Sequence, residues 1–453
     1  IMSRGLGDVY KRQVRMQRSS HDNGPDELRV VLLFPEGPAA KAGIAAGDVI
    51  VGVKSSKFRE GCLAALHKAL VKAEASNGEV VLLVRRSGEK KTLKIPVQIP
   101  AGGRAAAKPT SGDGRQAIVD AALAWLAQRQ IPDGGFTQTL SGTNGAVVMT
   151  ACAGLAWLGA GSDLKSGPYS DNVRRAAEFI AANLDGMGSV ASPRATGGAS
   201  WNQCNWGLSY GAIFLGELHA RTPERSVLLT LHTCAERLVK YQEKSGGWAH
   251  GPGGPNALGY VELNIVTGLA LGGLGLAAQS GFEVPEDCLE RAEKYLRESG
   301  GGDGGVGYST KPGQKGAGNI GRSAGAWLGD LALGKGKGGW GTTMGAYEKR
   351  HAGEVLGGHA SLMQHIQLAG VAAYAAGNGT VREFWKACER DLVLARAPDG
   401  SLQPRPWHES LSMGSNSDVT FGEVWTTAAW TMALVAETPR DHSRGFPGWF
   451  GRR

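Results

Sequence analysis

The sequence predicts a mostly α-helical protein: an α/α toroid of about six helix pairs, preceded by a small N-terminal domain that contains a β-sheet. Strand patterns occur only within residues 28–99. After residue 115, amphipathic helical segments alternate with segments that are apolar nearly all round. Turns with two adjacent glycines recur between them. At 453 residues the chain is also longer than one hydrophobic core usually holds, which favours two domains.

Composition and charge exclude several classes of protein. Glycine accounts for 70 residues, but it is not spaced at every third position and the chain carries long apolar helical runs, so a collagen-like or disordered chain is excluded. The formal charge is +8, of which residues 1–13 contribute +2. The remaining +6 is not gathered into dense Lys and Arg runs, and we therefore predict no nucleic-acid partner.

The N-terminus bears on localisation. GDVYKRQ at 7–13 resembles the in-frame translation of a transposon-end adapter used to prepare sequencing libraries, so we expect residues 1–13 to be foreign and the natural N-terminus to be missing. The location is therefore unknown from sequence, with a periplasmic or secreted one favoured. The uncharged run at 263–281 is rich in glycine and predicts a buried helix, with no membrane span.

The six cysteines show no C-x-x-C spacing and no close pairing with histidine, which predicts small core residues and no metal or other cofactor. They are Cys62, Cys152, Cys204, Cys234, Cys288 and Cys388.

Residues 28–99 carry the strand patterns in the order strand, Gly-Pro turn, short helix, Gly-Asp turn and strand, followed by a helix near 62–75 and two more strands. The segment GPAAKAGIAAGDVIVGV closely resembles the bacterial type of PDZ domain. This resemblance implies a docking site for a peptide C-terminus. The loop that would capture the carboxylate lies upstream of Leu28, where this sequence offers only RMQRSSHDNGPDE, so we expect a truncated groove. Two alternatives stay open: a domain that binds a peptide C-terminus, and one that packs on its neighbour and binds nothing. Residues 100–114 are predicted to be a linker.

Residues 115–437 carry the helical repeat, and residues 438–453 are a tail. Amphipathic segments begin near 115, 171, 224, 285, 341 and 380. Buried segments follow near 145, 206, 262, 321, 359 and 421. The repeat is roughly 50–60 residues long. Six such pairs, with the buried helices inside, predict a closed toroid.

The amphipathic segments end in glycine turns: QRQIPDGGF at 128–136, YQEKSGGW at 241–248 and GGDGGVGY at 301–308. Glycine accepts the left-handed conformation that ends a helix, and the aromatic ring can pack between neighbouring pairs. Similar turns mark the terpenoid cyclase and protein prenyltransferase toroids, which this region resembles. The combined architecture also resembles a group of environmental bacterial proteins that join a PDZ domain to a toroid.

The chemistry of those toroid families does not carry over. The chain has no Asp-x-Asp-Asp acid for a cyclase, and Asp287 and Cys288 have no histidine partner for a prenyltransferase zinc. The motif GAGNIG at 316–321 fits G-x-G-x-x-G but follows no strand, so nucleotide binding is not predicted.

Polar and aromatic residues gather where the buried segments begin. They are Asn144; Trp201, Asn202, Asn205, Trp206 and Tyr210; His250, Asn256, Tyr260, Glu262 and Asn264; Arg322 and Ser323; His359, Ser361 and His365; and Asp418, Glu423, Trp425 and Thr426. Each of them taken singly has an ordinary structural explanation as a helix cap or core residue. In a closed toroid most of them would lie on one rim of the central cavity, which would suit a polysaccharide.

Two functions of different classes stay open. One is a non-catalytic scaffold that docks a peptide at the PDZ-like domain and presents the toroid surface. The other is a carbohydrate-active enzyme with a site in the toroid cavity. Its predicted catalytic residues are Glu262, Tyr260, His250, Arg322 and His359, and its predicted substrate-binding residues are Trp201, Asn205, Trp206, Tyr210, Asn264 and Trp425.

The enzyme hypothesis contains two reactions. In a polysaccharide lyase, Arg322 or Asn264 would neutralise a uronate carboxylate while Tyr260 or His250 moves the proton. A glycoside hydrolase would need Glu262 paired with Asp418 or Glu423. The motif GYVELN at 259–264 places Glu262 at the start of an apolar helix, and we predict that its carboxylate faces a wet cavity.

Overall fold

The computed structural model describes residues 15–19, 27–33, 36–59, 61–86, 88–100, 109–137, 142–187, 203–251, 261–336, 338–404, 418–436 and 449. The prediction that residues 1–13 belong to neither domain lies outside these residues. The chain divides into two compact units. Unit 1 contains Ile1–Ala122 and Cys388–Val419, and unit 2 contains Leu123–Ala387 and Thr420–Arg453.

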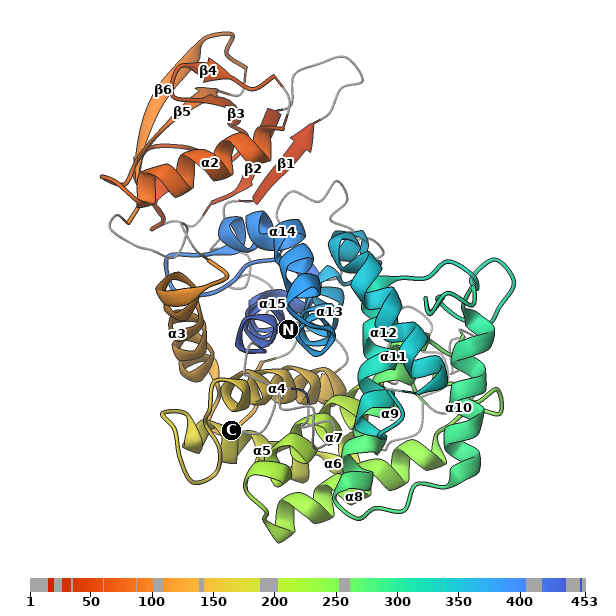
Figure 1. The fold of residues 1–453 in the computed structure, drawn as a ribbon. Coiled ribbons are helices and arrows are strands. Elements are labelled where there is room, and N and C mark those ends of the chain that lie inside the picture. Colours follow the sequence, from red (N-terminus) through yellow and green to blue (C-terminus); the bar gives the residue numbers. More distant parts are fainter. Residues whose placement is uncertain are drawn as a thin grey trace, which may run out of the picture. The chain divides into compact units, whose positions relative to one another are not determined.

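Unit 1 contains an antiparallel sheet in the order β1-β2-β3-β5-β6, with β4 paired to β3 (Figure 1). Its elements are β1 (Arg15–Ser19), β2 (Glu27–Leu32), α1 (Pro38–Lys41), β3 (Val49–Val53), β4 (Ser56–Lys57), α2 (Cys62–Glu74), β5 (Glu79–Arg85) and β6 (Thr92–Gln98). The sheet begins at Arg15, before the predicted boundary at 28, because Arg15–Ser19 pair with β2.

The predicted turns of unit 1 have clear local causes. Pro38 occupies the first turn of α1, where its missing N–H is not needed. The carboxylate of Asp48 accepts the backbone N–H of Ala45 at 2.9 Å and fixes the turn into β3. Alternate residues of the strands, including Val80, Leu82 and Val84, pack with Leu66 of α2 into one core.

After the sheet, six amphipathic helices alternate with six apolar ones, as predicted. The amphipathic set is α3 (Gly112–Arg129), α5 (Ser170–Ala182), α8 (Arg225–Lys240), α10 (Glu286–Ser299), α12 (Gly339–His351) and α14 (Asn378–Ala395). The apolar set is α4 (Gly142–Gly159), α7 (Cys204–Arg221), α9 (Asn264–Gln279), α11 (Ile320–Ala332), α13 (Leu362–Ala376) and α15 (Asp418–Val435). Two short elements, α6 (Leu184–Met187) and the 3-10 helix η1 (Ala352–Gly357), complete the described helices.

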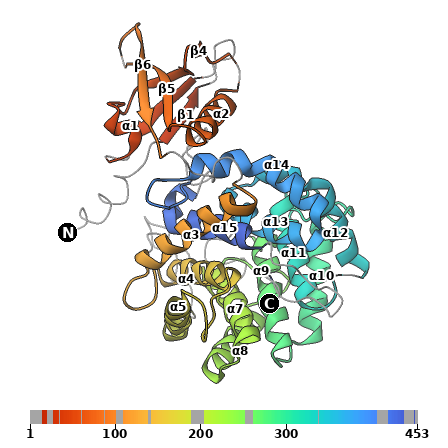
Figure 2. The same cartoon turned by 60° about the vertical axis from the view of Figure 1, so that its left-hand side comes forward.

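In unit 2 the apolar helices form an inner layer in which α4 packs on α7, α7 on α9, α9 on α11 and α11 on α13. The amphipathic helices α5, α8, α10 and α12 form an outer layer, and Figure 2 shows α8 beside α7 and α12 beside α11 and α13. Glycines allow the inner helices to approach closely: a Cβ at Gly268 of α9 would lie 2.6 Å from the backbone nitrogen of Ala326 in α11. The glycines of the inner helices therefore allow these helices to pack closely against one another.

The Gly-Gly turns connect neighbouring pairs. Gly134 and Gly246 have φ of +92° and +98°, which confirms the predicted left-handed conformation. A Cβ at Gly246 would lie 2.2 Å from the backbone oxygen of Arg291 in the next outer helix. The amide of Gln242 donates to the oxygen of Gly246 in its own turn and to that of Cys288 in α10. Each turn is thus bonded to the pair that follows.

Two further predictions concern the core and the membrane. All six cysteines are buried and free of disulfides, which confirms them as core residues. None of the helices in the described ranges has the length and apolarity needed to cross a bilayer.

Candidate functional site

The candidate site lies at the N-terminal ends of the inner helices of unit 2. There the first residues of one inner helix donate hydrogen bonds to the turn that precedes the next inner helix. The side chain of Asn205 donates to the oxygen of Ala249 at 2.9 Å, and its backbone N–H donates to the oxygen of His250 at 3.1 Å. One pair further on, Asn264 makes the same two bonds to Gly307 and Tyr308, at 2.8 and 3.2 Å.

His250 and Tyr308 therefore occupy equivalent positions in successive repeats. His250 lies two residues after Trp248, and Tyr308 lies two residues after Val306, which is the counterpart of Trp248 in the next glycine turn. In the next repeat the amide of Asn319 donates to the oxygen of Gly357 at 3.5 Å, two residues before His359. His359 stands one position later in its turn than His250 and Tyr308 do in theirs, so three successive turns carry an imidazole or a phenol at this end of the inner layer.

Arg322, Tyr308 and His359 come together, and we name them the Arg322 cluster. The guanidinium lies 5.7 Å from the ring centre of Tyr308, and the rings of Tyr308 and His359 meet edge to face at 5.7 Å. Arg322 is 8% exposed, Tyr308 is half-buried and His359 is exposed. The cluster therefore reaches solvent through His359 while its cation stays largely buried.

The charge of Arg322 is not balanced by a nearby acid. Its Nε donates to the oxygen of Val306 at 3.3 Å and its Nη2 to the oxygen of Ala317 at 3.4 Å. Within the described part of the chain, no Asp or Glu side chain forms an ion pair with it. Burial lowers the pKa of Arg322 to about 10, so it is still a cation at neutral pH.

Trp206 and His250 form a second group at this end. The indole Nε1 of Trp206 donates to Nδ1 of His250 at 2.8 Å, and the two ring centres lie 5.9 Å apart. Burial lowers the pKa of His250 to about 4, so its imidazole is neutral at pH 7. The half-buried indole of Trp206 offers an apolar face for stacking.

His365 lies beneath the Arg322 cluster on α13 and is 3% exposed. Burial, and then the charge of Arg322, lower the pKa of His365 to about 3. A Cβ at Gly321 would lie 2.3 Å from its Nδ1. The last glycine of the G-x-G-x-x-G motif therefore allows α11 to contact α13, which is a packing role.

Four residues predicted to bind substrate are instead parts of the core. Asn205 and Asn264 are fully buried and hold the turns described above. Tyr210 is fully buried, and its hydroxyl accepts the amide of Gln367. Trp425 is 3% exposed, meets Tyr210 edge to face and donates to Ser361 Oγ at 3.2 Å. These contacts join α7 to α13 and α15, so side chains fill the middle of the inner layer at the level of Tyr210.

Glu262 lies elsewhere. Its Oε1 accepts the hydroxyl of Ser245 at 2.8 Å in an exposed contact with the Gly-Gly-Trp turn, and Tyr295 of α10 donates to its backbone oxygen. The N-cap of α9 is Leu263, so Glu262 does not cap the helix. The predicted residues Tyr260 and Trp201 lie outside the described residues.

Tyr308 is the site residue that the sequence prediction missed. In GGDGGVGY its ring is indistinguishable from the aromatic residue that closes any other glycine turn. Aligning the turns would have found it, because Tyr308 stands where His250 stands in the preceding turn. Over the described ranges, no group of three His, Cys, Asp or Glu side chains is placed to hold a metal ion.

The fold is shared with solved enzymes. An inactive variant of the α-1,6-mannanase GH76A of Salegentibacter sp. HEL1_6, in complex with α-1,6-mannotriose, is 10% identical, covers 71% of this chain and 98% of its own, and has a TM-score of 0.50. The type II terpene cyclase MstE from Scytonema is 13% identical over 71% of this chain and 97% of its own, with a TM-score of 0.40. The similarity to the mannanase variant establishes the α/α toroid fold.

No curated protein matches the chain in sequence. A family model described as a domain of unknown function, DUF6288, matches residues 116–438, which include all six helix pairs except the first few residues of α3. The chain therefore belongs to the DUF6288 family.

Proposed function

We propose that this protein is a carbohydrate-active enzyme that binds an acidic polysaccharide at the Arg322 cluster and cleaves it by β-elimination. The observation that carries the proposal is the buried guanidinium of Arg322, which has no acidic partner among the described residues. A largely buried charge is costly unless it is paired. The carboxylate of a uronate residue would supply that missing charge.

The neighbours of Arg322 suit the rest of the reaction. With the carboxylate held by Arg322, the proton on the adjacent carbon becomes more acidic, and His359 or Tyr308 would remove it; both lie beside the guanidinium or its aromatic neighbour. The electron pair of that C–H bond forms the new carbon–carbon double bond as the glycosidic C–O bond breaks. The leaving oxygen takes up a proton, from the tyrosine or from water.

Elimination is favoured over hydrolysis by the residues of the cluster. Glycoside hydrolysis ordinarily needs two carboxylates on opposite sides of the scissile bond. The Arg322 cluster contains none, and the carboxylate of Glu262 is hydrogen-bonded to Ser245. The mannotriose complex of the mannanase is consistent with a glycan ligand for this fold, but the residues of the cluster carry the argument.

The test compares polymers with and without uronate. Purified full-length protein is incubated with polygalacturonate, alginate and a neutral mannan, and the ultraviolet absorbance of unsaturated ends is followed together with reducing ends. We expect both signals from at least one uronate polymer and neither from mannan. Reducing ends without absorbance would indicate hydrolysis and contradict the proposed reaction.

Two variants test whether the cleavage takes place at the Arg322 cluster. His359→Gln and Tyr308→Phe should each lower the cleavage rate by roughly 100-fold, the usual contribution of a general acid or base. His232→Gln is the matched control, because His232 also meets an aromatic ring, that of Phe282 at 5.5 Å, but lies on the outer helix α8. Cleavage that is unchanged in both cluster variants would refute the site.

A non-catalytic scaffold is the second candidate. It is favoured by the side chains of Tyr210, Gln367 and Trp425, which fill the middle of the inner layer where an enzyme cavity was predicted. Its distinguishing result would be saturable binding of a uronate polymer, weakened by Arg322→Lys, with no cleavage under any condition. Peptide docking at the PDZ-like sheet of unit 1 belongs to this candidate.

A further inference from the structure

The turn that carries His359 has an unusual backbone. The N–H of Ser361 donates to the carbonyl oxygen of His359 at 2.9 Å, so only Ala360 lies between donor and acceptor. Ala360 has φ of +65°, and in the described part of the chain Lys54 is the other residue besides glycine with a positive φ. A hydrogen bond of this span around a positive φ makes a γ-turn of the rare, strained type.

The C-terminal side of the turn is fixed by the hydroxyl of Ser361. This residue is the N-cap of α13, and its Oγ accepts the backbone N–H of Gln364 at 3.2 Å. The same oxygen accepts the indole Nε1 of Trp425, from α15, at 3.2 Å. The two donors occupy both acceptor positions of the hydroxyl oxygen. The end of the turn is therefore bonded to two inner helices at once.

The N-terminal side of the turn packs on His365. A Cβ at Gly358 would lie 2.8 Å from Cγ of the His365 ring, so the close contact depends on the glycine. His365 is 3% exposed, whereas His359 is exposed and meets the ring of Tyr308 edge to face. The backbone is thus held on both sides of an imidazole that reaches solvent.

Helix capping alone does not require the strain at Ala360. Asn319 caps α11 in the same way, since its side chain accepts the N–H of Gly321 at 3.1 Å. The two residues before that cap, Ala317 and Gly318, have no positive φ. Strained backbone persists only where the surrounding structure imposes it, and it gathers at functional sites. The strained turn therefore has a reason other than the start of α13.

We infer that Ser361 and Trp425 are positioning residues, and that their hydrogen bond keeps the imidazole of His359 beside its aromatic neighbour by holding the strained turn. Without that bond, the strain at Ala360 would be released by a movement of His359 relative to Tyr308. The catalytic part of the inference rests on the proposed function. Trp425, predicted from sequence to bind substrate, would then act on the reaction through the turn.

Nuclear magnetic resonance of the full chain, labelled with ¹³C at histidine Cε1, reports the position of the imidazole whether or not a polymer is cleaved. The His359 signal is the one that His359→Gln removes, and its displacement in Tyr308→Leu measures the effect of the tyrosine ring. Trp425→Phe removes the indole donor and keeps an aromatic ring, and Ser361→Ala removes the acceptor. At the same pH, both should move the signal towards its position in Tyr308→Leu.

Kinetics on the uronate polymer that the wild type cleaves provide the second measurement. Trp425→Phe and Ser361→Ala should lower kcat and leave KM nearly unchanged, because Arg322 keeps its own bonds to Val306 and Ala317. A displacement of about 1 Å can cost about 100-fold in rate, so we expect kcat to fall by about 10- to 100-fold.

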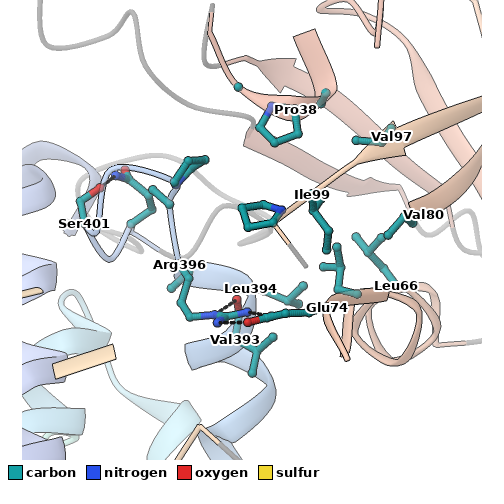
Figure 3. A pocket seen from close by; sticks show the side chains of 18 of the residues that line it. Pro38, Leu66, Glu74, Val80, Val97, Ile99, Val393, Leu394, Arg396 and Ser401 are labelled. Carbon is teal, nitrogen blue, oxygen red and sulfur yellow. Dashed lines mark hydrogen bonds and ion pairs between the residues drawn. The ribbon is translucent and has the colours of Figure 1, made fainter. Parts of the chain in front are cut away.

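Two control variants remove contacts of similar kind elsewhere. Trp327→Phe takes a buried indole donor from α11, where Nε1 donates to the oxygen of Gly336 at 3.1 Å. Arg396→Lys weakens the pair in which both oxygens of Glu74 accept from the guanidinium, at 3.2 and 2.6 Å, as Figure 3 shows for unit 1. Neither control should move the His359 signal or change kcat.

The outcomes separate the inference from the proposed function. A His359 signal that stays in place in both Ser361→Ala and Trp425→Phe would overturn the inference, as would an equal displacement in Trp327→Phe. An unchanged kcat in an active enzyme would overturn the positioning role and leave the proposed function intact. A displaced signal in a protein that cleaves no uronate polymer would refute the proposed function and support the hold of this bond on His359.

Discussion

Gly246→Ala should destabilise unit 2 through two separable effects. The backbone at Gly246 has φ of +98°, and a left-handed conformation costs an alanine about 1–2 kcal/mol. The new Cβ would also lie 2.2 Å from the backbone oxygen of Arg291 and 2.5 Å from its carbonyl carbon, so α10 would have to shift. Overpacking of this kind costs about 1–3 kcal/mol. We therefore expect a total loss of about 2–5 kcal/mol.

The chain contains a control for the first effect alone. Gly281 has φ of +95°, but no heavy atom lies within 4 Å of the position that a Cβ would occupy there. Gly281→Ala should therefore lose only about 1–2 kcal/mol. With an unfolding entropy of ~2.1 cal/mol/K per residue over the about 300 residues of unit 2, each kcal/mol lowers Tm by about 1.6 °C.

Thermal unfolding followed by circular dichroism should accordingly show Tm lowered by about 3–8 °C for Gly246→Ala and by about 2–3 °C for Gly281→Ala. The difference between the two measures the close approach of the turn to α10. Equal losses in the two variants would refute the inference that this turn joins neighbouring pairs through a contact that only glycine permits.

Three further experiments test other contacts. Trp449→Ala should cost about 3–5 kcal/mol, measured by denaturant unfolding, because the ring is fully buried and the backbone N–H donates to Glu217. Burial raises the pKa of Asp330 to about 6 from an ordinary 3.8, so the folded state binds this proton more tightly than the unfolded state does. Stability should fall by up to about 3 kcal/mol as pH rises from about 4 to about 6, and Asp330→Asn should remove that dependence when Tm is compared at pH 4.5 and 7. In a double-mutant cycle, Glu74→Gln and Arg396→Lys should show a coupling of about 1–3 kcal/mol, whereas additive losses would mean that the pair adds nothing to unit 1.

Much of the fold could be predicted from the sequence because periodicity reports burial. The alternation between 286–299, with an apolar stripe, and 264–279, apolar all round, distinguishes outer from inner helices without any structure. The left-handed glycines were also predictable, since few other residues end a helix in that way. The start of the sheet was not, because RMQRS has no apolar alternation and becomes a strand by pairing with β2.

The candidate site was only partly predictable, for a physical reason. Asn205 and Asn264 begin inner helices just as a ligand-binding residue would, but they are satisfied by backbone oxygens of another repeat, and the sequence does not show that pairing. Tyr210 has the sequence position of a rim residue, yet its hydroxyl lies against Gln367 on α13. Arg322 was predicted as a candidate from the sequence, whereas its neighbour Tyr308 could have been found only by aligning the glycine turns, in which it stands where His250 stands.

The turns after the outer helices also bear on how this protein can be re-engineered. Gly134 contacts Arg175, and Gly246 contacts Arg291. The number of residues between glycine and arginine is not the same in the two contacts. The join between neighbouring pairs therefore does not depend on the length of the chain that leads from one to the next. Loops between a turn and the following outer helix should accept a reporter peptide or a protease site, whereas the turn itself should accept almost no change. A library that varies loop length and keeps every Gly-Gly turn would change the surface at the ends of the helices while the helical framework stays the same.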